Sequence, residues 1–356
     1  MTLRFDADVA EYAQTVRSAL AEGSDAEAAW KALCSLGAIG LGIPSELGGA
    51  DGAADAVAAV MEVLGERIVE GPLLYSTIWA AQTILTAPLE PGGRDVVAGV
   101  ADGSVRVALG VVGSDAGWWA TEPPGLSAER VDGGWQLSGR HDLVLGSDPT
   151  RLLVLAATPG GPALFVVAPD AAGCDLRVEV LLDGVTRLSS LSLSRVSGEL
   201  VVGPEHAERA VAAGIRAAVV ASAAAALGGA ARCLAITVEH ARTREQFGSA
   251  LGSFQAVKHR LVDVGVQIEC ARSALFLALA GGSADGPVAA AYASSAKAWC
   301  SSAYDAAAAA AVQLHGAIGF SEEHAAPHHF TRATVTRALL GSPEQHMARV
   351  ADLLGL

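Results

Sequence analysis

One short turn carries the residues best suited to bind a charged ligand. Arg244 and Gln246 stand on either side of Glu245 and are followed by Phe247 and Gly248. A guanidinium can donate two parallel hydrogen bonds to a phosphate, and a glycine lets the backbone turn tightly beside it. These residue types predict a site for a diphosphate. The alternative is that Arg244 only neutralises the carbonyl groups at the end of a helix.

A second segment places glycines beside an amide and an imidazole. It contains Gln313, His315, Gly316 and Gly319. Because glycine has no Cβ atom, Gly316 and Gly319 would let the main chain approach a ligand closely. The alternative is that Gln313 and His315 are buried polar groups that cap the end of an alanine-rich helix.

Three histidines follow this segment, at His324, His328 and His329. No carboxylate or cysteine stands at a metal-ligand spacing from them, and the neighbouring Glu322 and Glu323 are typical of a solvated loop. The sequence therefore predicts a surface loop here and no metal site.

The composition limits the classes of partner. Lys and Arg number 24 against 38 Asp and Glu, a net charge of −14, which argues against a nucleic-acid partner. The five cysteines are scattered singly, and the first residues lack the apolar core of a signal peptide, so we expect a cytoplasmic protein. The apolar run Ala217–Ala231 is too short to span a bilayer and predicts a buried helix, with no membrane partner.

The hydrophobic patterns divide the chain into three parts. Residues 1–103 are helical in pattern, residues 104–204 are short β-rich segments between Gly, Pro and Asp clusters, and residues 205–356 are helical again. An apolar stripe runs from Phe254 to Leu275, where we expect a dimer interface, and Ser342 and Gln345 fit a capping box. This order predicts an α+β fold with an N-terminal α-helical domain, a middle small antiparallel β domain and a C-terminal α-helical bundle.

Three ordered motifs resemble those of the acyl-CoA dehydrogenase family. The turn 244–248, with Phe254 and Gln255 after it, is similar to the family's Arg-x-Gln-Phe-Gly turn and the Phe-Gln that begins its next helix. Residues 313–319 resemble its Gln-x-His-Gly-Gly-x-Gly segment, with Ala317 in place of the second glycine. Residues 36–49, which include Pro44 and Glu46, are similar to its N-terminal Pro-Glu-x-x-Gly-Gly loop.

The resemblance implies an acyl-CoA dehydrogenase-like fold and an FAD-dependent enzyme that desaturates an acyl-CoA substrate and passes electrons to an acceptor flavoprotein. In the family the two C-terminal segments meet across a subunit boundary, which implies a homodimer or tetramer, or a hetero-oligomer with a longer homologue. The residues for which it implies FAD contacts are Arg244, Gln246, Phe247, Gln313, Gly316 and Gly319.

The family's catalytic base is missing from both of its expected positions. The resemblance places a glutamate before a Gly-Ser pair ahead of the last helix or, in a minority of the family, before Arg216. This chain has Leu340 and Ile215 there, and neither aliphatic side chain can remove an α-proton. Glu344 is the remaining candidate, but as the second residue of a capped helix it complements the helix dipole and would point away from an apolar pocket.

The middle part departs from the family as well. Gly113-Ser114-Asp115 precedes Thr121-Glu122-Pro123, the reverse of the family's order, and the segment 139–147 lacks its Trp-x-Thr. The motifs for the dinucleotide end of the cofactor are therefore better preserved than those for the reaction end.

Three hypotheses follow. The first is a dehydrogenase subunit that completes a flavin site while a related partner chain supplies the base, as in heteromeric actinobacterial members of the family. The second is a non-enzymatic structural partner subunit. The third is a homo-oligomeric flavoenzyme with an unrecognised base.

Overall fold

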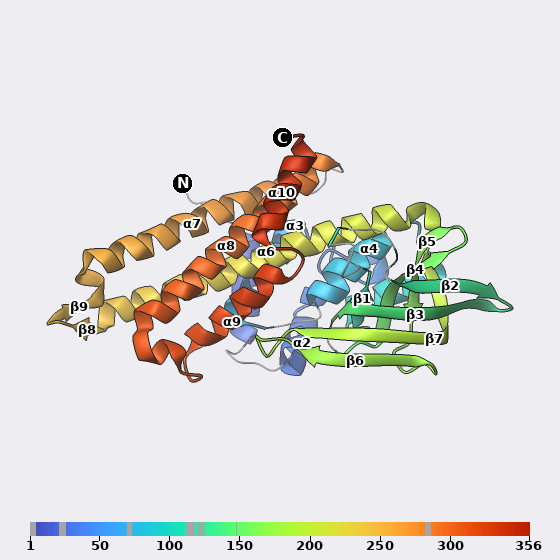
Figure 1. Cartoon of the computed structure of the whole chain (residues 1–356), viewed down its shortest axis with the longest axis horizontal. Helices are drawn as coiled ribbons and strands as arrows, with labels where there is room; N and C mark the ends of the chain where they lie inside the picture. The colour runs from blue at the N-terminus through green and yellow to red at the C-terminus, as the bar shows by residue number, and fades with distance from the viewer. Residues whose placement is uncertain are drawn as a thin grey trace. The chain divides into compact units, whose positions relative to one another are not determined.

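A computed structural model describes residues 5–20, 26–69, 73–111, 118–119, 123, 125–146, 148–281 and 286–356. Helices come first, then strands, then helices again, so the α+β fold class is confirmed (Figure 1). The segments Gly113–Asp115 and Thr121–Glu122 lie outside the described residues. Contacts group the chain into two compact units, Met1–Asp25 with Ala54–Val69 and Val219–Leu356, and Ala26–Ala53 with Glu70–Ala218. The predicted domain boundaries after residues 103 and 204 stay predictions.

The second of these units contains a seven-stranded sheet and short helices. The helices are α2 (Ala26–Ser35), the π-helix η3 (Leu73–Ala81), α4 (Gln82–Leu85), α5 (Pro91–Asp102) and the first part of α6 (Pro204–Thr243). The strands are β1 (Val107–Gly110), β2 (Leu126–Val131), β3 (Gly134–Leu145), β4 (Arg151–Thr158), β5 (Gly161–Val167), β6 (Cys174–Val180) and β7 (Arg187–Val202). Two short 3-10 turns, η1 (Ala38–Gly40) and η2 (Ser45–Leu47), lie in the predicted N-terminal loop.

The sheet has the order β1-β3-β2-β4-β5-β7-β6 and is mixed. Most neighbours pair antiparallel, but β1 pairs with β4 in parallel from Val107 opposite Arg151 to Gly110 opposite Val154. The prediction of a wholly antiparallel sheet is therefore wrong in this detail. The core of the sheet is built from alternating apolar residues, and Trp135 packs against Phe165 with ring centroids 5.3 Å apart.

The other unit is a bundle of helices. It contains α1 (Ala7–Ala19), α3 (Ala54–Arg67), the later part of α6, α7 (Gln255–Ala280), α8 (Pro287–His315), α9 (Ala325–Ala338) and α10 (Pro343–Leu354). The 3-10 turn η4 (Leu251–Ser253) precedes α7, and η5 (Gly316–Phe320) follows α8. Alanines make up much of the buried face of α8, and their small side chains let neighbouring helices approach closely.

Two glycines bring the backbones of α3 and α6 into direct contact. A Cβ atom on Gly65 would stand 1.8 Å from the carbonyl oxygen of Ala225. One on Gly228 would stand 1.9 Å from the carbonyl oxygen of Glu62. Any larger residue at either position would push these helices apart, so α3 is an integral part of the bundle although it lies near the start of the sequence.

The apolar stripe of α7 packs inside the chain. Val264, Ile268, Ala271 and Leu275 are buried in the bundle itself. The prediction of a dimer interface is therefore wrong for these four residues, because here the period of the stripe identified the face that packs against the chain's own helices. For Phe254, which is exposed, it stays a prediction. By length and composition one described helix, α6, could cross a membrane, but 67% of its most apolar window is buried inside the protein. The prediction of a buried helix at 217–231 is confirmed.

Candidate active site

The predicted Arg244 turn is a hairpin at the end of the bundle. Strands β8 (Glu245–Gln246) and β9 (Ser249–Ala250) pair there, and Phe247 and Gly248 form the connection with φ of 53° and 77°. Two successive residues with positive φ are what a two-residue hairpin loop needs, which explains the glycine. The amide of Arg244 donates to the carbonyl oxygen of His240 at 2.8 Å, so the turn is held directly by the last turn of α6.

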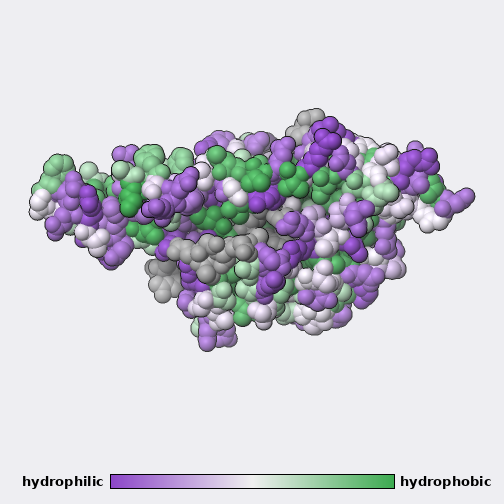
Figure 2. Space-filling model, turned by 90° about the horizontal axis from the view of Figure 1, so that it is seen from below, coloured by the Kyte–Doolittle hydropathy of each residue, from purple (hydrophilic) through white to green (hydrophobic). Residues whose placement is uncertain are grey.

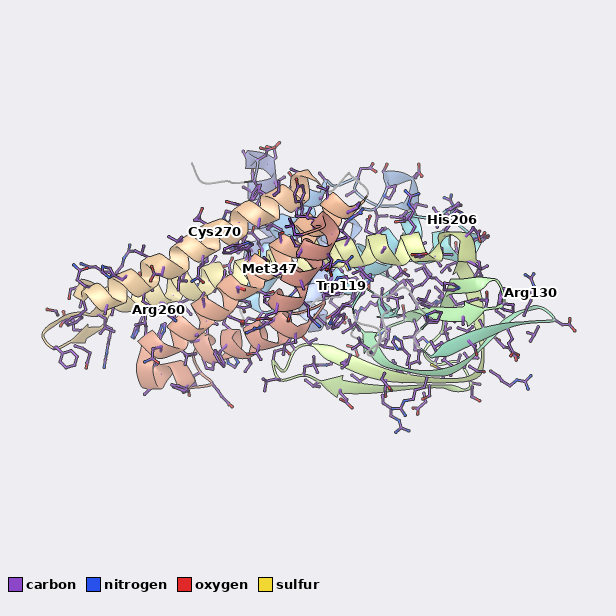
Figure 3. The ribbon with its side chains drawn as sticks, turned by 45° about the horizontal axis from the view of Figure 1, so that its top comes forward. Trp119, Arg130, His206, Arg260, Cys270 and Met347 are labelled. Atoms are coloured by element: carbon purple, nitrogen blue, oxygen red, sulfur yellow. The ribbon has the colours of Figure 1, made fainter. Side chains whose placement is uncertain are left out.

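The side chains of this turn face solvent. Phe247 is 93% exposed, and its ring makes an edge contact with Phe254 at a centroid distance of 6.2 Å. Arg244 and Gln246 are exposed as well, and the structure gives the Arg244 guanidinium no ion pair within the described residues. Figure 2 shows apolar and polar surface intermixed at this end of the bundle, the end that carries β8 and β9 in Figure 1. Arg260 lies on α7 near the same end (Figure 3).

The second predicted segment begins where α8 ends. Gln313 is exposed, whereas His315 is buried and its Nδ1 donates to the carbonyl oxygen of Ala311 at 2.7 Å. The alternative of a buried, helix-capping group is thus wrong for Gln313. Gly316 has φ of 63° and open space where a Cβ atom would stand. A Cβ atom on Gly319 would lie 2.6 Å from a carbonyl oxygen of α8, so packing within the chain already requires that glycine.

The two segments come together inside one chain. The imidazole of His240, near the end of α6, lies 4.3 Å from that of His315, measured between ring centroids. This follows from the topology, since α6 and α8 run in the same direction with α7 returning between them. The ends of both helices therefore lie at the same end of the bundle, and the expectation that the segments meet across a subunit boundary is not needed to bring them together.

The residue at the family's main base position is Leu340, in the turn between α9 and α10. Its side chain is fully buried, and its backbone has φ of 63°, which is uncommon outside glycine. The Nε2 of His346 donates to its carbonyl oxygen at 2.9 Å. The predicted capping box of Ser342 and Gln345 is present in the next helix. Ile215, at the minority position, is also buried, in α6.

Glu344 is engaged on the surface. It is exposed and forms an ion pair with Arg337, which also lies 3.3 Å from Asp305. A hydrogen bond with its own backbone, followed by one with Ser342, lowers the pKa of Glu344. A base in a dry pocket would show the opposite shift, because burial raises the pKa of a carboxyl group. The placement agrees with a dipole-complementing helix start.

The histidines after the second segment do not share one environment. Among the described residues no group of His, Cys, Asp and Glu side chains could hold a metal ion. His328 is exposed, and its Nε2 contacts the carbonyl oxygen of Glu322 at 2.8 Å. His329 is buried on α9, 2.7 Å from the hydroxyl group of Tyr304, so the surface-loop prediction is wrong for His329. Burial lowers its pKa to about 3.

Sequence reasoning missed a lysine in the centre of the bundle. Lys297 is fully buried on α8, and its Nζ donates to the Ser301 hydroxyl group at 2.8 Å and to the Thr336 carbonyl oxygen at 2.7 Å. Burial lowers the pKa of Lys297 to about 7. The sequence did contain a signal for this buried lysine: Lys297 is a lone cation with an alanine on each side, in a helix rich in alanine.

A buried histidine in the sheet was missed as well. His141 on β3 is 2% exposed, and burial lowers its pKa to about 4. Its Nε2 has no hydrogen-bond partner within the described part of the chain. A Cβ atom on Gly110 would stand 2.6 Å from this imidazole, so β1 leaves room for it only because residue 110 is glycine.

Comparisons with known proteins agree with this arrangement. The family model for the acyl-CoA dehydrogenase C-terminal domain matches residues 210–355. The chain belongs to the acyl-CoA dehydrogenase family and is of the oxidoreductase class that the sequence motifs predicted. A curated relative, acyl-CoA dehydrogenase IpdE2 of Mycobacterium tuberculosis, is 33% identical over 341 residues, which is 94% of this chain and 89% of the relative.

Solved structures show the same fold. A steroid acyl-CoA dehydrogenase variant, Tcur3481-Tcur3483, is 28% identical with a TM-score of 0.84, covering 98% of this chain and 97% of that one. The ChsE4-ChsE5 complex of M. tuberculosis has a TM-score of 0.86 at 24% identity, covers 100% of this chain and 99% of that one, and supports the fold alone.

Proposed function

We propose that this chain is a subunit of an FAD-dependent acyl-CoA dehydrogenase that desaturates an acyl-CoA thioester between the α and β carbons. In this proposal the chain completes a flavin site, and a related, longer partner chain supplies the catalytic base. The observation that carries the proposal is the residue at the family's base position, Leu340. Its aliphatic side chain is fully buried, and a hydrogen bond from His346 to its carbonyl oxygen holds the backbone of the turn.

The residues of the bundle end fit the diphosphate part of FAD. Arg244 is exposed with no ion pair among the described residues, Gln246 stands beside it, and Gly316 has open space next to its backbone. An exposed guanidinium with neighbouring amide donors is the arrangement that a diphosphate requires. FAD, when bound, supplies the acceptor for the β-hydride. Arg244, Gln246, Phe247, Gln313 and Gly316 are the residues that we propose hold it; Gly319 shapes the turn beneath them.

The chain's own residues leave the proton-transfer step incomplete. An α-proton must pass to a positioned base, and general-base assistance contributes about 10²–10⁴ in rate. Leu340 and Ile215 hold no proton acceptor, and Glu344 is committed to its ion pair with Arg337 on the surface. This favours a partner that supplies the base over an unrecognised base in this chain.

Exposed apolar side chains support an oligomer. Phe247, Ile318 and Phe320 are more than half exposed at the ends of α6 and α8, and Val262 and Val266 are exposed on the outer face of α7. Aromatic residues are enriched in protein–protein interfaces relative to the rest of the protein surface. One solved neighbour, Tcur3481-Tcur3483, is named as a pair of proteins, which favours a hetero-oligomer here over a homodimer or tetramer.

The proposal is tested by purifying the chain alone and together with a longer homologue from the same genome. Flavin absorbance reports FAD, light scattering reports assembly, and an acyl-CoA panel with an artificial electron acceptor reports activity. We expect stoichiometric flavin and turnover only in the mixed complex. Turnover by the chain alone that Glu344→Gln abolishes would refute the proposal, and a protein that binds no flavin in either form would support the structural-subunit hypothesis. Cytoplasmic location and the electron-acceptor flavoprotein are part of the same proposal.

A further inference from the structure

Three imidazoles lie in a row at the end of the bundle, with neighbouring ring planes tilted by 31° and 49°, and we call this row the histidine stack. The ring of His315 lies between two others, 4.3 Å from that of His240 and 4.4 Å from that of His324, measured between centroids. The three rings come from α6, the end of α8 and the residue that precedes α9. His315 is buried, whereas the outer two rings are half-buried. The stack directly joins the two segments that carry Arg244 and Gly316.

Backbone hydrogen bonds determine which ring nitrogens can take up a proton. The Nδ1 of His315 donates to the carbonyl oxygen of Ala311, so its Nε2 holds a lone pair when the ring is neutral. The Nδ1 of His324 accepts a hydrogen bond from the amide of Ala326 and caps α9. A proton added to His324 would break that cap. His315 can bind a proton without losing its hydrogen bond.

The surroundings lower the pKa of both outer rings. Burial lowers the pKa of His240, and neighbouring positive charges lower it further; these belong to His315, Arg244 and His324. Burial and then the charge of His315 lower the pKa of His324. Within the described residues, the charges that lower the pKa of the two outer rings belong to basic groups, and an anion brought to Arg244 would oppose them.

We propose that the histidine stack and Arg244 form one proton-linked anion subsite, which holds the diphosphate of a nucleotide and takes up a proton as the diphosphate binds. The proposal rests on the proposed function, in which that nucleotide is FAD. Each anionic charge next to the stack favours the imidazolium form, and the proton in turn strengthens the attraction for the anion. In the pH interval where one proton is taken up, the affinity rises by up to tenfold for each pH unit of acidification.

The experiment uses inorganic pyrophosphate as the probe and the full chain as the protein. Isothermal titration calorimetry in two buffers of different ionisation enthalpy, between pH 6 and 8, counts the protons taken up on binding. We expect uptake that reaches up to one proton at an intermediate pH and vanishes at high pH, with an affinity that falls as the pH rises through the interval where protons are taken up. His315→Gln keeps an amide donor for Ala311 and should abolish the uptake.

A second variant and a control keep the result interpretable. His240→Gln alters the half-buried outer ring and should reduce the uptake even if the His315 variant folds poorly. His259→Gln changes an exposed histidine on α7 and should leave the uptake unchanged. Pyrophosphate binding with no proton uptake, or uptake that both stack variants retain, would overturn the inference, as would a chain that binds no pyrophosphate.

FAD binding to the purified mixed complex separates this inference from the proposed function. Binding of FAD with no proton uptake overturns the subsite and leaves the flavoenzyme standing. Proton-linked binding of pyrophosphate by a protein that never binds FAD supports the subsite and refutes the flavoenzyme.

Discussion

Replacing Lys297 by methionine should stabilise the protein at low pH and destabilise it at high pH. Burial depresses the pKa of this amine from its ordinary 10.5 to about 7. At 1.36 kcal/mol for each pH unit, this gap corresponds to a cost of about 5 kcal/mol for burying the charged form. Between pH 7 and 10.5 the unfolded chain binds more protons than the folded one, so the wild-type free energy of unfolding should rise with pH across this interval.

The methionine variant keeps most of the side-chain volume and has no charge to bury. It loses the hydrogen bonds to Ser301 and Thr336, and a buried carbonyl oxygen left without its donor costs about 1–3 kcal/mol. Below pH 7 the variant should therefore be more stable than the wild type by about 2–4 kcal/mol. Above about pH 10 the order should reverse, because the neutral lysine keeps its hydrogen bonds at little cost.

Urea unfolding of both proteins, followed by helical circular dichroism at several pH values from 6 to 10, measures this difference. Subtracting the two curves removes the titration of all other groups, which the variants share. A difference in the free energy of unfolding that stays constant with pH would refute the reasoning and show that Lys297 titrates as it does in the unfolded chain. Lys297→Arg, which keeps the charge at all pH values, serves as the contrasting variant.

Three further outcomes are expected. Arg244→Ala should weaken FAD binding in the mixed complex by at least tenfold, because each lost charge-assisted hydrogen bond costs about 1.5–3 kcal/mol. Arg260→Ala, on nearby α7, should leave FAD binding unchanged, and equal retention of flavin by both variants would contradict the proposed site. Leu340→Glu should restore measurable turnover to a mixed complex whose partner chain has lost its own base, and no gain in the acyl-CoA assay would show that the turn does not face substrate. Gly228→Ala should lower the melting temperature by several degrees, while Gly265→Ala, whose Cβ atom meets nothing closer than 3.8 Å, should be neutral or slightly stabilising.

Local patterns in the sequence predicted much of the fold. The period of apolar residues identified the helices of the bundle, and Ser342 with Gln345 predicted the start of α10, since a capping box depends on residues only three positions apart. Pairing between distant strands is not encoded in such a pattern. The parallel pairing of β1 with β4 therefore could not be predicted. The period identified the apolar face of α7, but it could not show that the chain's own helices cover that face.

In the candidate site, too, some features follow from neighbouring residues and others depend on parts of the chain that are far apart in the sequence. The hairpin at Phe247 and Gly248 follows from neighbouring residues, and its conformation is as the motif indicates. The stack of His240, His315 and His324 joins residues far apart in the chain, and only the return of α8 to the end of α6 brings them together. Burial of His329 likewise depends on the neighbouring α8, which presents the hydroxyl group of Tyr304 to it.

The close approach of α3 and α6 affects the folding of the chain during its synthesis on the ribosome. The helix that carries Gly65 leaves the ribosome roughly 150 residues before the part of α6 that packs on it, and at 5–20 residues per second that interval is on the order of ten seconds or more. During synthesis the apolar face of α3 therefore stays without its α6 partner for this interval. An expression plasmid that starts at residue 210, where the family model begins, would produce a bundle without this helix.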